Sequence, residues 1–280
     1  MREVNVQEIA RAVAELCARA NIEADPVALD LIRKGKAKEK SVLARSILDL
    51  ILKNASIARR EMLPLCQDTG MVVVWLDIGQ DVHLVGGDLA GAVDEGVRQA
   101  WKECYFRHSV VADPFRRKNT GDNTPAVIHT RIVSGERVVV RVGPKGFGGE
   151  NASGTAMLQP NAGMEGVADY VVERVRLAGV NACPPLVIGV GVGGTLEKAA
   201  LLAREALLLP LDYRNPDPLL RRLERRILGK VNQLGIGPQG LGGELTALAA
   251  RVLSYPTHIA GLPVAVNICC HVFRHREKTI

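Results

Sequence analysis

Three cysteines occupy positions that suit metal ligands. Cys66, Cys183 and Cys270 each stand beside turn-forming or polar residues rather than on an apolar stripe. Their thiolates could bind the iron of an iron–sulfur cluster, but the intervals between them are far wider than the local CxxC pairs of zinc ribbons and ferredoxins. The residues alone therefore leave two interpretations, one shared cluster or three unrelated buried thiols, and the spacing favours the second.

Two further cysteines are expected to be structural. Cys17 and Cys104 fall on the apolar faces of predicted helices, where a thiol behaves as a small buried hydrophobic group. We therefore exclude both as ligands. The chain has six cysteines among 280 residues and no recognisable secretory signal, which favours metal binding or catalysis over a disulfide framework.

The residues that follow Cys66 place an amide, a carboxylate and a hydroxyl in one tight loop. They are Gln67, Asp68 and Thr69. Asp68 could act as a general acid or base, or orient a substrate. It could equally cap the turn before Gly70, which is a common role of aspartate in loops.

Arg107 and His258 are the other candidates for chemistry. Arg107 and His108 are expected to end a helix that spans about residues 90–107, where positive charge is favoured near the C-terminus. Arg107 could also hold a substrate carboxylate with two hydrogen bonds. His258 lies in a loop before the strand that leads to Cys270, and a single histidine in a loop is usually a surface residue.

Three glycine-rich segments suggest close approach of a ligand or of other backbone. They are GPKGFGGENASG (143–154), GVGVGG (189–194) and GIGPQGLGGE (235–244), all interpreted as loops. GVGVGG lacks the spacing of the dinucleotide-binding fingerprint, so nucleotide binding is not expected. Further along, Arg221, Arg222, Arg225 and Arg226 lie on the outside of a basic helix and are expected to form a solvated face.

The elements that must position these residues form a mixed α/β pattern. Apolar periodicity predicts helices over about 5–21, 39–61, 90–107, 163–178, 195–209 and 217–235. Strands are predicted at MVVVWLDIG, PLVIGVGVGG and VAVNICCHVF, and a hairpin at AVIHTRIVSGERVVVRVG that turns at Ser134 and Gly135. The fold class is therefore mixed α/β (α+β). A helical lead-in over residues 1–62 precedes a sheet flanked by helices with glycine-rich loops, in a single domain of residues 1–280.

Composition excludes several classes of protein. Hydrophobic residues make up 47% of the chain and charged residues 24%, as in ordinary soluble proteins. No apolar run reaches the ~18 residues that mark a membrane span, so we expect no membrane association and a cytoplasmic location. The net charge is +6, but aromatic residues make up only 4%, so nucleic-acid binding by base stacking is not expected.

Six sequence blocks, taken together and in order, resemble the alpha subunit of class I fumarate hydratases and the related L-tartrate dehydratases. The blocks are LPLCQDTGM, RKNTGDNTPAVIH, PKGFGGEN, NACPPLVIGVGVGG, LGIGPQGLGG and VAVNICCH, and they extend over nearly the whole chain. The resemblance implies a 4Fe-4S cluster that is held by Cys66, Cys183 and Cys270, with the fourth iron left open for substrate. Cys269 replaces a residue that is commonly not cysteine in the family. Neighbours on a strand point to opposite faces, so only one of the two adjacent cysteines is expected to bind iron.

The resemblance also implies roles for the polar residues. Asp68 and His258 match catalytic positions of the family, whereas Gln67, Arg107, Gly148 and Gly149 match positions around the substrate. The open iron would act as a Lewis acid in the reversible hydration of fumarate to L-malate, a step of the tricarboxylic acid cycle.

The family further implies that this chain is incomplete alone. The catalytic base and further carboxylate contacts resemble contributions of a separate beta-type subunit, so a heterotetramer with two copies of each subunit and a small dicarboxylate substrate are expected. Two alternatives are an L(+)-tartrate dehydratase alpha subunit and a non-catalytic iron–sulfur sensor or scaffold.

Overall fold

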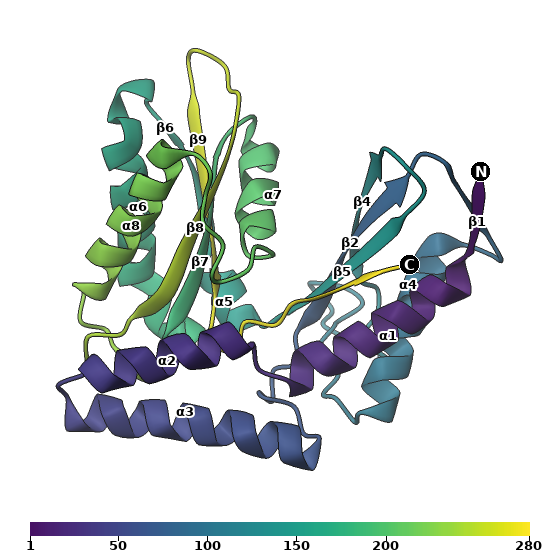
Figure 1. Cartoon of the computed structure of the whole chain (residues 1–280), viewed down its shortest axis with the longest axis horizontal. Helices are drawn as coiled ribbons and strands as arrows, with labels where there is room; N and C mark the ends of the chain where they lie inside the picture. The colour runs from purple at the N-terminus through teal and green to yellow at the C-terminus, as the bar shows by residue number, and fades with distance from the viewer. The chain divides into compact units, whose positions relative to one another are not determined.

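The computed structural model describes residues 1–280, along which helices and strands are mixed (Figure 1). The helices are α1 (Val6–Ile22), α2 (Pro26–Lys38), α3 (Val42–Glu61), α4 (Leu89–Glu103), α5 (Phe147–Ala152), α6 (Gly163–Ala178), α7 (Leu196–Ala206) and α8 (Pro218–Asn232). The strands are β1 (Arg2–Asn5), β2 (Met71–Gly79), β3 (Val82–Val85), β4 (Val127–Val133), β5 (Val138–Lys145), β6 (Gly154–Leu158), β7 (Leu186–Gly193), β8 (Ala247–Tyr255), β9 (Leu262–Cys269) and β10 (Arg276–Thr279). The predicted mixed α/β class is confirmed. The strands form two four-stranded sheets and a two-stranded one rather than a single sheet.

The chain divides into two compact units, each built from separated segments. Unit 1 contains Met1–Ala24, Asn54–Gly146 and Arg274–Ile280, and unit 2 contains Asp25–Lys53 and Phe147–Phe273. Residues 1–62 contain β1, α1, α2 and α3, which are shared between the units. That residues 1–280 serve as one catalytic domain stays a prediction.

Unit 1 is built on a sheet in the order β10-β5-β2-β4, with β1 and β3 forming a separate parallel pair. All but the first residue of β2 is buried, and helices α1 and α4 pack together on the core that β2 and β5 share. The predicted hairpin through Ser134 and Gly135 is wrong, because β4 and β5 do not pair with each other. They lie on opposite sides of β2, β4 parallel to it and β5 antiparallel.

Unit 2 is built on a sheet in the order β6-β9-β7-β8, with α6 and α8 against one face and α7 against the other (Figure 1). Strand β7 explains this arrangement. Leu186, Ile188 and Val190 join the core with α6 and α8, whereas the alternate positions Gly189 and Gly191 meet α7. The segment 189–193, which the sequence placed both in the predicted strand PLVIGVGVGG and among the glycine-rich loops, is strand, and its glycines allow α7 to approach closely.

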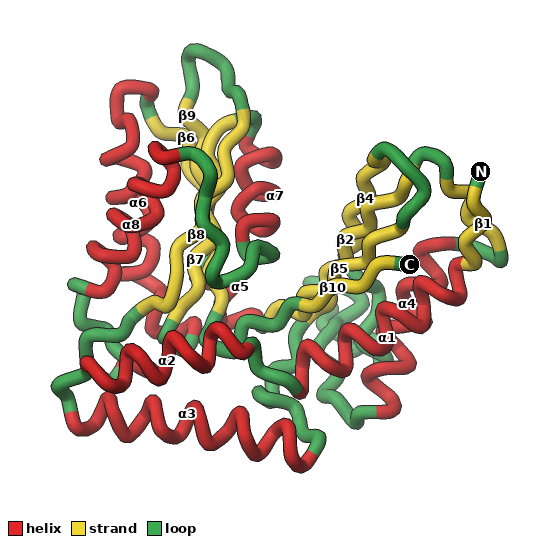
Figure 2. The backbone as a smooth tube through the Cα atoms, in the orientation of Figure 1, coloured by secondary structure: helices red, strands yellow, loops and turns green.

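Several helices begin where an Asn or Asp side chain accepts a hydrogen bond from the first turn. Asn5 begins α1 and Asp88 begins α4 in this way, and Asp25 and Asp217 precede α2 and α8, each followed by a proline in the first turn. In Figure 2, α2, α4 and α8 start directly after loop segments, whereas α1 follows strand β1. Local sequence thus determines where these four helices begin.

The predicted helix over 90–107 ends early, at Glu103. Tyr105 adopts a left-handed backbone conformation with φ of 52°, and Phe106 turns back to pack edge-on against Trp101, with ring centroids 5.4 Å apart. Burial of Phe106 therefore ends the helix, and Arg107 lies in the following loop. The predicted strand over 264–273 likewise ends at Cys269. The segment 143–154 is not a loop, because it contains the end of β5 and helix α5.

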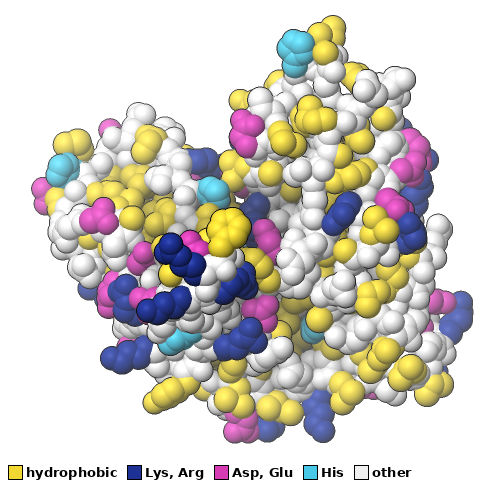
Figure 3. All heavy atoms as spheres, turned by 180° about the vertical axis from the view of Figure 1, so that it is seen from behind, with side chains coloured by type: hydrophobic (Ala, Val, Ile, Leu, Met, Phe, Trp, Pro, Cys, Tyr) yellow, Lys and Arg dark blue, Asp and Glu magenta, His cyan; other side chains and the backbone are white.

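Charged side chains of both signs cover the surface. On the face in Figure 3, Lys and Arg side chains are interspersed with Asp and Glu. None of the helices combines the length and the apolar character that a membrane span needs.

The close packing of β7 against α7 predicts that Gly191→Ala destabilises the protein. An added Cβ at this position would lie 2.0 Å from the carbonyl oxygen of Ala199, so backbone must move, which typically costs about 1–3 kcal/mol. Urea unfolding followed by circular dichroism measures the change. Gly229→Ala on α8, where nothing lies within 4 Å, is the control and is expected to be neutral or stabilising by up to about 1 kcal/mol. Equal effects of the two substitutions would contradict the packing argument.

Candidate functional site

The loop that carries Cys66 is fixed by two fully buried polar side chains. Thr69 Oγ1 donates to the Arg107 carbonyl oxygen at 2.7 Å, and Asn123 Nδ2 donates to the Gly70 carbonyl at 3.1 Å. Asn123 Oδ1 also accepts from the backbone N–H of Ser109 at 2.7 Å. These bonds join the loop of Cys66 to the loop of Arg107 within unit 1.

Asp68 sits inside this loop and caps it. Its Oδ1 accepts from the backbone N–H of Gly70 at 3.1 Å, which is the turn-capping interaction considered from the sequence. Gly70 needs to be glycine, because its φ is +81° and an added Cβ would lie 2.6 Å from the carbonyl carbon of Lys145. The cap orients the carboxylate and does not exclude a role in binding substrate.

The side chain of Arg274 binds the backbone of Asp68. Its guanidinium is buried, and Nη1 donates to the Asp68 carbonyl at 2.6 Å and to Asn21 Oδ1 at 2.9 Å. An added Cβ on Gly146 would lie 3.0 Å from both Arg274 Nη2 and Asp68 Oδ2. Gly146 therefore leaves room for the guanidinium beside the carboxylate.

Arg107 combines a fixed backbone with an exposed side chain. Its carbonyl accepts from Thr69 Oγ1 and from Trp101 Nε1, the latter at 3.1 Å. The guanidinium is solvent-exposed, as is the amide of Gln67. Unit 1 thus ties the loop that carries Gln67 and Asp68 to the backbone of Arg107, and the roles of these three residues stay predictions.

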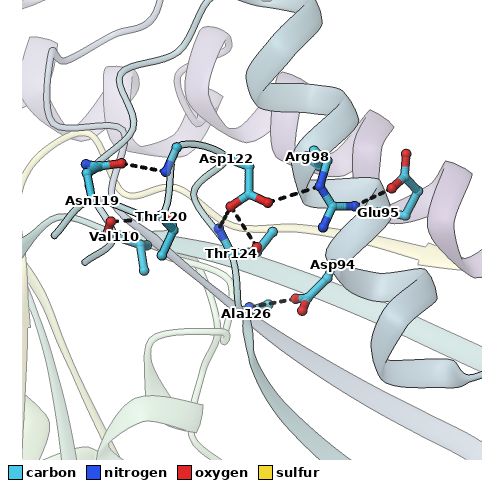
Figure 4. A network of polar contacts seen from close by, with 10 residues as sticks. Asp94, Glu95, Arg98, Val110, Asn119, Thr120, Asp122, Thr124 and Ala126 are labelled. Carbon is cyan, nitrogen blue, oxygen red and sulfur yellow. Dashed lines mark hydrogen bonds and ion pairs between the residues drawn. The ribbon is translucent and has the colours of Figure 1, made fainter. Parts of the chain in front are cut away.

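A polar network fixes the rest of the Arg107 loop (Figure 4). Asp122 accepts from Arg98 Nε at 3.1 Å and from Thr124 Oγ1 at 2.8 Å, and Asp94 accepts from the Ala126 N–H at 2.8 Å. Partial burial by itself would raise the pKa of Asp122. The hydrogen bonds from Thr124 and Arg98 prevail and lower this pKa to about 2.

In unit 2, Cys183 follows a short 3₁₀ turn, Gly179–Ala182, and adopts a left-handed conformation with φ of 55°. Helix α5 packs against this turn. An added Cβ at Gly148 would lie 2.6 Å from the Asn181 carbonyl oxygen, and Gly149 is buried in the same helix. The structure therefore places Gly148 and Gly149 near the Cys183 segment, and close backbone packing explains Gly148.

His271 connects the segments of Cys183 and Cys270. Its Nδ1 lies 3.0 Å from the Cys183 carbonyl oxygen, and because a carbonyl only accepts, Nδ1 carries the proton. The Gln239 side chain donates to the Pro184 carbonyl at 3.0 Å, so the glycine-rich segment 235–244 reaches the same end of the sheet. One end of unit 2 thus gathers three of the sequence blocks.

The two adjacent cysteines at the end of β9 differ in their surroundings. Cys269 is the last residue of the strand and packs against a hydrophobic cluster that includes Val187 and Phe273. Cys270 follows the strand and is half-buried. Both thiols are half-buried, so exposure does not separate them, and the choice of Cys270 as the ligand stays a prediction.

His258 lies elsewhere in unit 2. It follows β8, and its loop is tied to the end of β7 by Thr257 Oγ1, which donates to the Gly194 carbonyl at 2.9 Å. Cys183 precedes β7 and Cys270 follows the antiparallel β9, so both lie at the other end of the sheet. At about 3.3 Å per residue, the eight residues of β7 put roughly 25 Å between the two ends. The structure does not bring His258 to Cys183 and Cys270 within unit 2, and its catalytic role stays a prediction.

The cysteines separate into two chemical groups. Cys17 is fully buried, which raises the pKa of its thiol far above the usual range, and desolvation likewise raises the pKa of Cys104. Metal ligation needs the thiolate, so these two are poor ligands. Cys183 is exposed, and Cys66 and Cys270 are half-buried at loop positions, which fits the donor chemistry of an iron–sulfur cluster.

No group of three His, Cys, Asp or Glu side chains forms a metal site in residues 1–280. Cys66 belongs to unit 1, whereas Cys183 and Cys270 belong to unit 2. Their combination in one cluster therefore stays a prediction.

Sequence reasoning missed Asn123, His271 and Arg274. Each acts on a residue far away in the chain, so no local pattern identifies it. The only signal was indirect. Asn123 lies inside the block RKNTGDNTPAVIH, and His271 lies inside VAVNICCH, which also carries Cys270.

Comparison with known proteins agrees with the family resemblance of the sequence blocks. The family model described as fumarate hydratase (Fumerase) matches residues 10–279. The chain belongs to this family, whose members are hydro-lyases.

Three relatives are similar to the chain over nearly its whole length. A Methanocaldococcus jannaschii protein, provisionally named L(+)-tartrate dehydratase subunit alpha, is 36% identical over 281 residues, which cover 98% of each chain. The L(+)-tartrate dehydratase subunits alpha of Escherichia coli K12 and of Shigella sonnei are each 32% identical over 279 residues, which cover 98% of this chain and 91% of theirs.

The lowered pKa of Asp122 predicts a pH dependence of stability. Because the folded-state pKa lies below the usual 3.8, the ionised carboxylate stabilises the fold above about pH 4, and this contribution is lost as pH falls toward 2. Asp122→Asn removes it, so the stability of the variant should fall less steeply between pH 4 and pH 2.5. Urea midpoints across this range measure the slopes. Parallel slopes for the two proteins would contradict the assignment.

Proposed function

We propose that this chain is the alpha-type subunit of a hydro-lyase that adds or removes water across the central bond of a four-carbon dicarboxylate. The observation that carries the proposal is the buried hydrogen bond from Thr69 to the Arg107 carbonyl. It ties the backbone of Arg107, whose side chain is exposed, to the loop that bears Cys66, Gln67 and Asp68. The family match over residues 10–279 supports the same reaction class.

The proposed cofactor is a 4Fe-4S cluster with Cys66, Cys183 and Cys270 as its ligands. The loop positions and accessibility of these thiols fit such a group, whereas Cys17 and Cys104 do not. When bound, a cluster with one open iron would supply a Lewis acid for the departing hydroxyl group, without redox change.

The chain's own residues bind and orient the substrate in this proposal. Arg107 offers a planar guanidinium that can bind one carboxylate of a dicarboxylate with two parallel hydrogen bonds. Gln67 offers an amide for a second polar group of the substrate. Asp68 is oriented by Gly70 and Arg274, so its carboxylate can direct the substrate hydroxyl or accept a proton.

A beta-type subunit completes the site in this proposal. The relatives are named as alpha subunits, which supports the presence of a partner. Within unit 2, His258 lies at the opposite end of the sheet from Cys183 and Cys270, so no base is proposed beside these two cysteines. We propose that the partner provides the base, in an assembly with two copies of each subunit.

Fumarate with L-malate is the first proposed substrate pair, and L(+)-tartrate is the second. The description of the family model favours fumarate, whereas the names of the relatives favour tartrate. The two hydroxy acids differ by one hydroxyl group, and a site built to hydrogen-bond that group should reject the analogue that lacks it.

Serine substitutions test the cluster ligands. After anaerobic reconstitution, the wild-type chain with its partner should bind about four iron atoms per chain, and Cys66→Ser, Cys183→Ser and Cys270→Ser should each lose most of that iron and sulfide. Cys104→Ser and Cys269→Gln are the controls and should retain it. Full retention by any of the three variants removes that residue from the ligand set.

Activity with and without the partner tests the divided site. The reconstituted chain alone should turn over L-malate and L(+)-tartrate at least ~10²-fold more slowly than the mixture, because a positioned base typically contributes ~10²–10⁴-fold. The ratio of kcat/KM for the two acids identifies the physiological substrate. Full activity of the chain alone would refute the divided site, and an inactive mixture with an intact cluster would favour a sensor or scaffold.

A further inference from the structure

Unit 2 contains a cavity that no step of the proposed reaction uses. It has a volume of about 190 Å³ and lies where α8 and the segment before it meet β8. Its lining is unusually rich in cations, with Arg214, Arg221, Arg225 and Arg251 beside Tyr213 and the single carboxylate of Glu224. None of these residues belongs to the candidate functional site.

The basic residues of α8 differ in their partners. On one side of the helix, Arg226 pairs with Glu165, and Lys230 pairs with Glu165 and with Asp169, the latter at 2.7 Å. These charges are neutralised by α6. The basic residues on the other side of α8 lack such partners. A helix face that is only solvated would not need this difference between its two sides.

On the side that lines the cavity, the guanidinium groups have donors to spare. Arg221 makes one bond, from Nη1 to the Asn215 carbonyl at 3.3 Å, and no ion pair or hydrogen bond engages Arg225 or Arg214. Arg221 and Arg225 are four residues apart, so they lie one above the other on the same helix face. The cavity therefore concentrates positive charge that the nearby carboxylates of Glu224 and Asp212 compensate only in part.

Glu224 compensates only part of this charge, and its carboxylate also binds the fold. It is 7% exposed, and its Oε1 accepts from the Val252 N–H at 2.9 Å and from Asn215 Nδ2 at 3.1 Å. Asn215 also donates to the Val252 carbonyl at 3.0 Å. The carboxylate thus holds the edge strand β8 and the segment 213–215 at the base of the cavity.

Arg251 forms a rigid wall of the same cavity. It donates to the carbonyls of Pro210, Leu211 and Ala250, which fixes its guanidinium against the backbone. Burial lowers the pKa of Arg251, opposed by the nearby carboxylates of Glu224 and Asp212. An anion at this place would find one cation already positioned and three others able to turn toward it.

We propose that this cavity binds a small, multiply charged oxyanion, either a phosphate group or a dicarboxylate. The volume suits an anion of a few heavy atoms, and planar guanidinium groups bind phosphate and carboxylate oxygens in pairs. The bound anion joins α8 to the segment 213–215, so it also stabilises unit 2 against unfolding. The proposal does not depend on the proposed reaction or on the cluster.

Isothermal titration calorimetry of the full chain at low ionic strength tests the proposal, with inorganic phosphate and succinate as separate probes. At least one probe should bind saturably to a single site. Arg225→Gln and Arg214→Gln should each weaken that binding roughly tenfold or more, as expected for loss of a hydrogen bond between charged groups. Arg222→Gln is the matched control, because it removes the same charge from the exposed side of the same helix without lining the cavity.

A second control separates this cavity from the candidate substrate site. Arg107→Gln should leave the binding of phosphate unchanged within about twofold, and the probe should raise the midpoint of thermal unfolding in wild type and Arg222→Gln but not in Arg225→Gln. Equal weakening by Arg222→Gln, or loss of phosphate binding in Arg107→Gln, would overturn the proposal. Binding of a polyglutamate peptide without saturable binding of either probe would also overturn it, because the surface would then suit an acidic protein partner.

Discussion

Two buried carbonyl groups determine the geometry of the candidate site in unit 1. A buried carbonyl without a donor costs about 1–3 kcal/mol, so the carbonyls of Arg107 and Gly70 require partners. Thr69, Trp101 and Asn123 provide them from inside the fold. Because these donors bind backbone carbonyls, they join the two loops, while the side chain of Arg107 is exposed and the Asp68 carboxylate caps Gly70.

In unit 2, the positions of the cysteines depend on how closely backbone segments can approach one another. Gly148 lets α5 contact the turn before Cys183, and Gly191 lets α7 contact β7. The contact at Gly148 helps to place the turn before Cys183. His271, which follows β9, is then hydrogen-bonded to the Cys183 carbonyl. Small residues thus align the segments, and a polar side chain fixes them.

The sequence predicted what depends on neighbouring residues. The apolar run of β2, the helix over Gly163–Ala178 and the burial of Cys17 follow from local periodicity, and all three are confirmed. The hairpin through Ser134 and Gly135 was wrong because its turn signal is local, whereas the insertion of β2 between the two strands is not. His271 and Arg274 escaped notice for the same reason, since their partners lie 88 and 206 residues away.

The order in which the segments of unit 1 occur along the chain has a consequence for synthesis. The first residues and the last strand belong to the same unit, since β10 pairs with β5 and Arg276 donates to the Glu23 carbonyl at 2.7 Å. On the ribosome, all of unit 2 emerges before β10 does. Unit 2 can therefore form its core first, while unit 1 keeps one edge of its sheet open until β10 has emerged and is exposed to chaperones or to unwanted pairing for that interval.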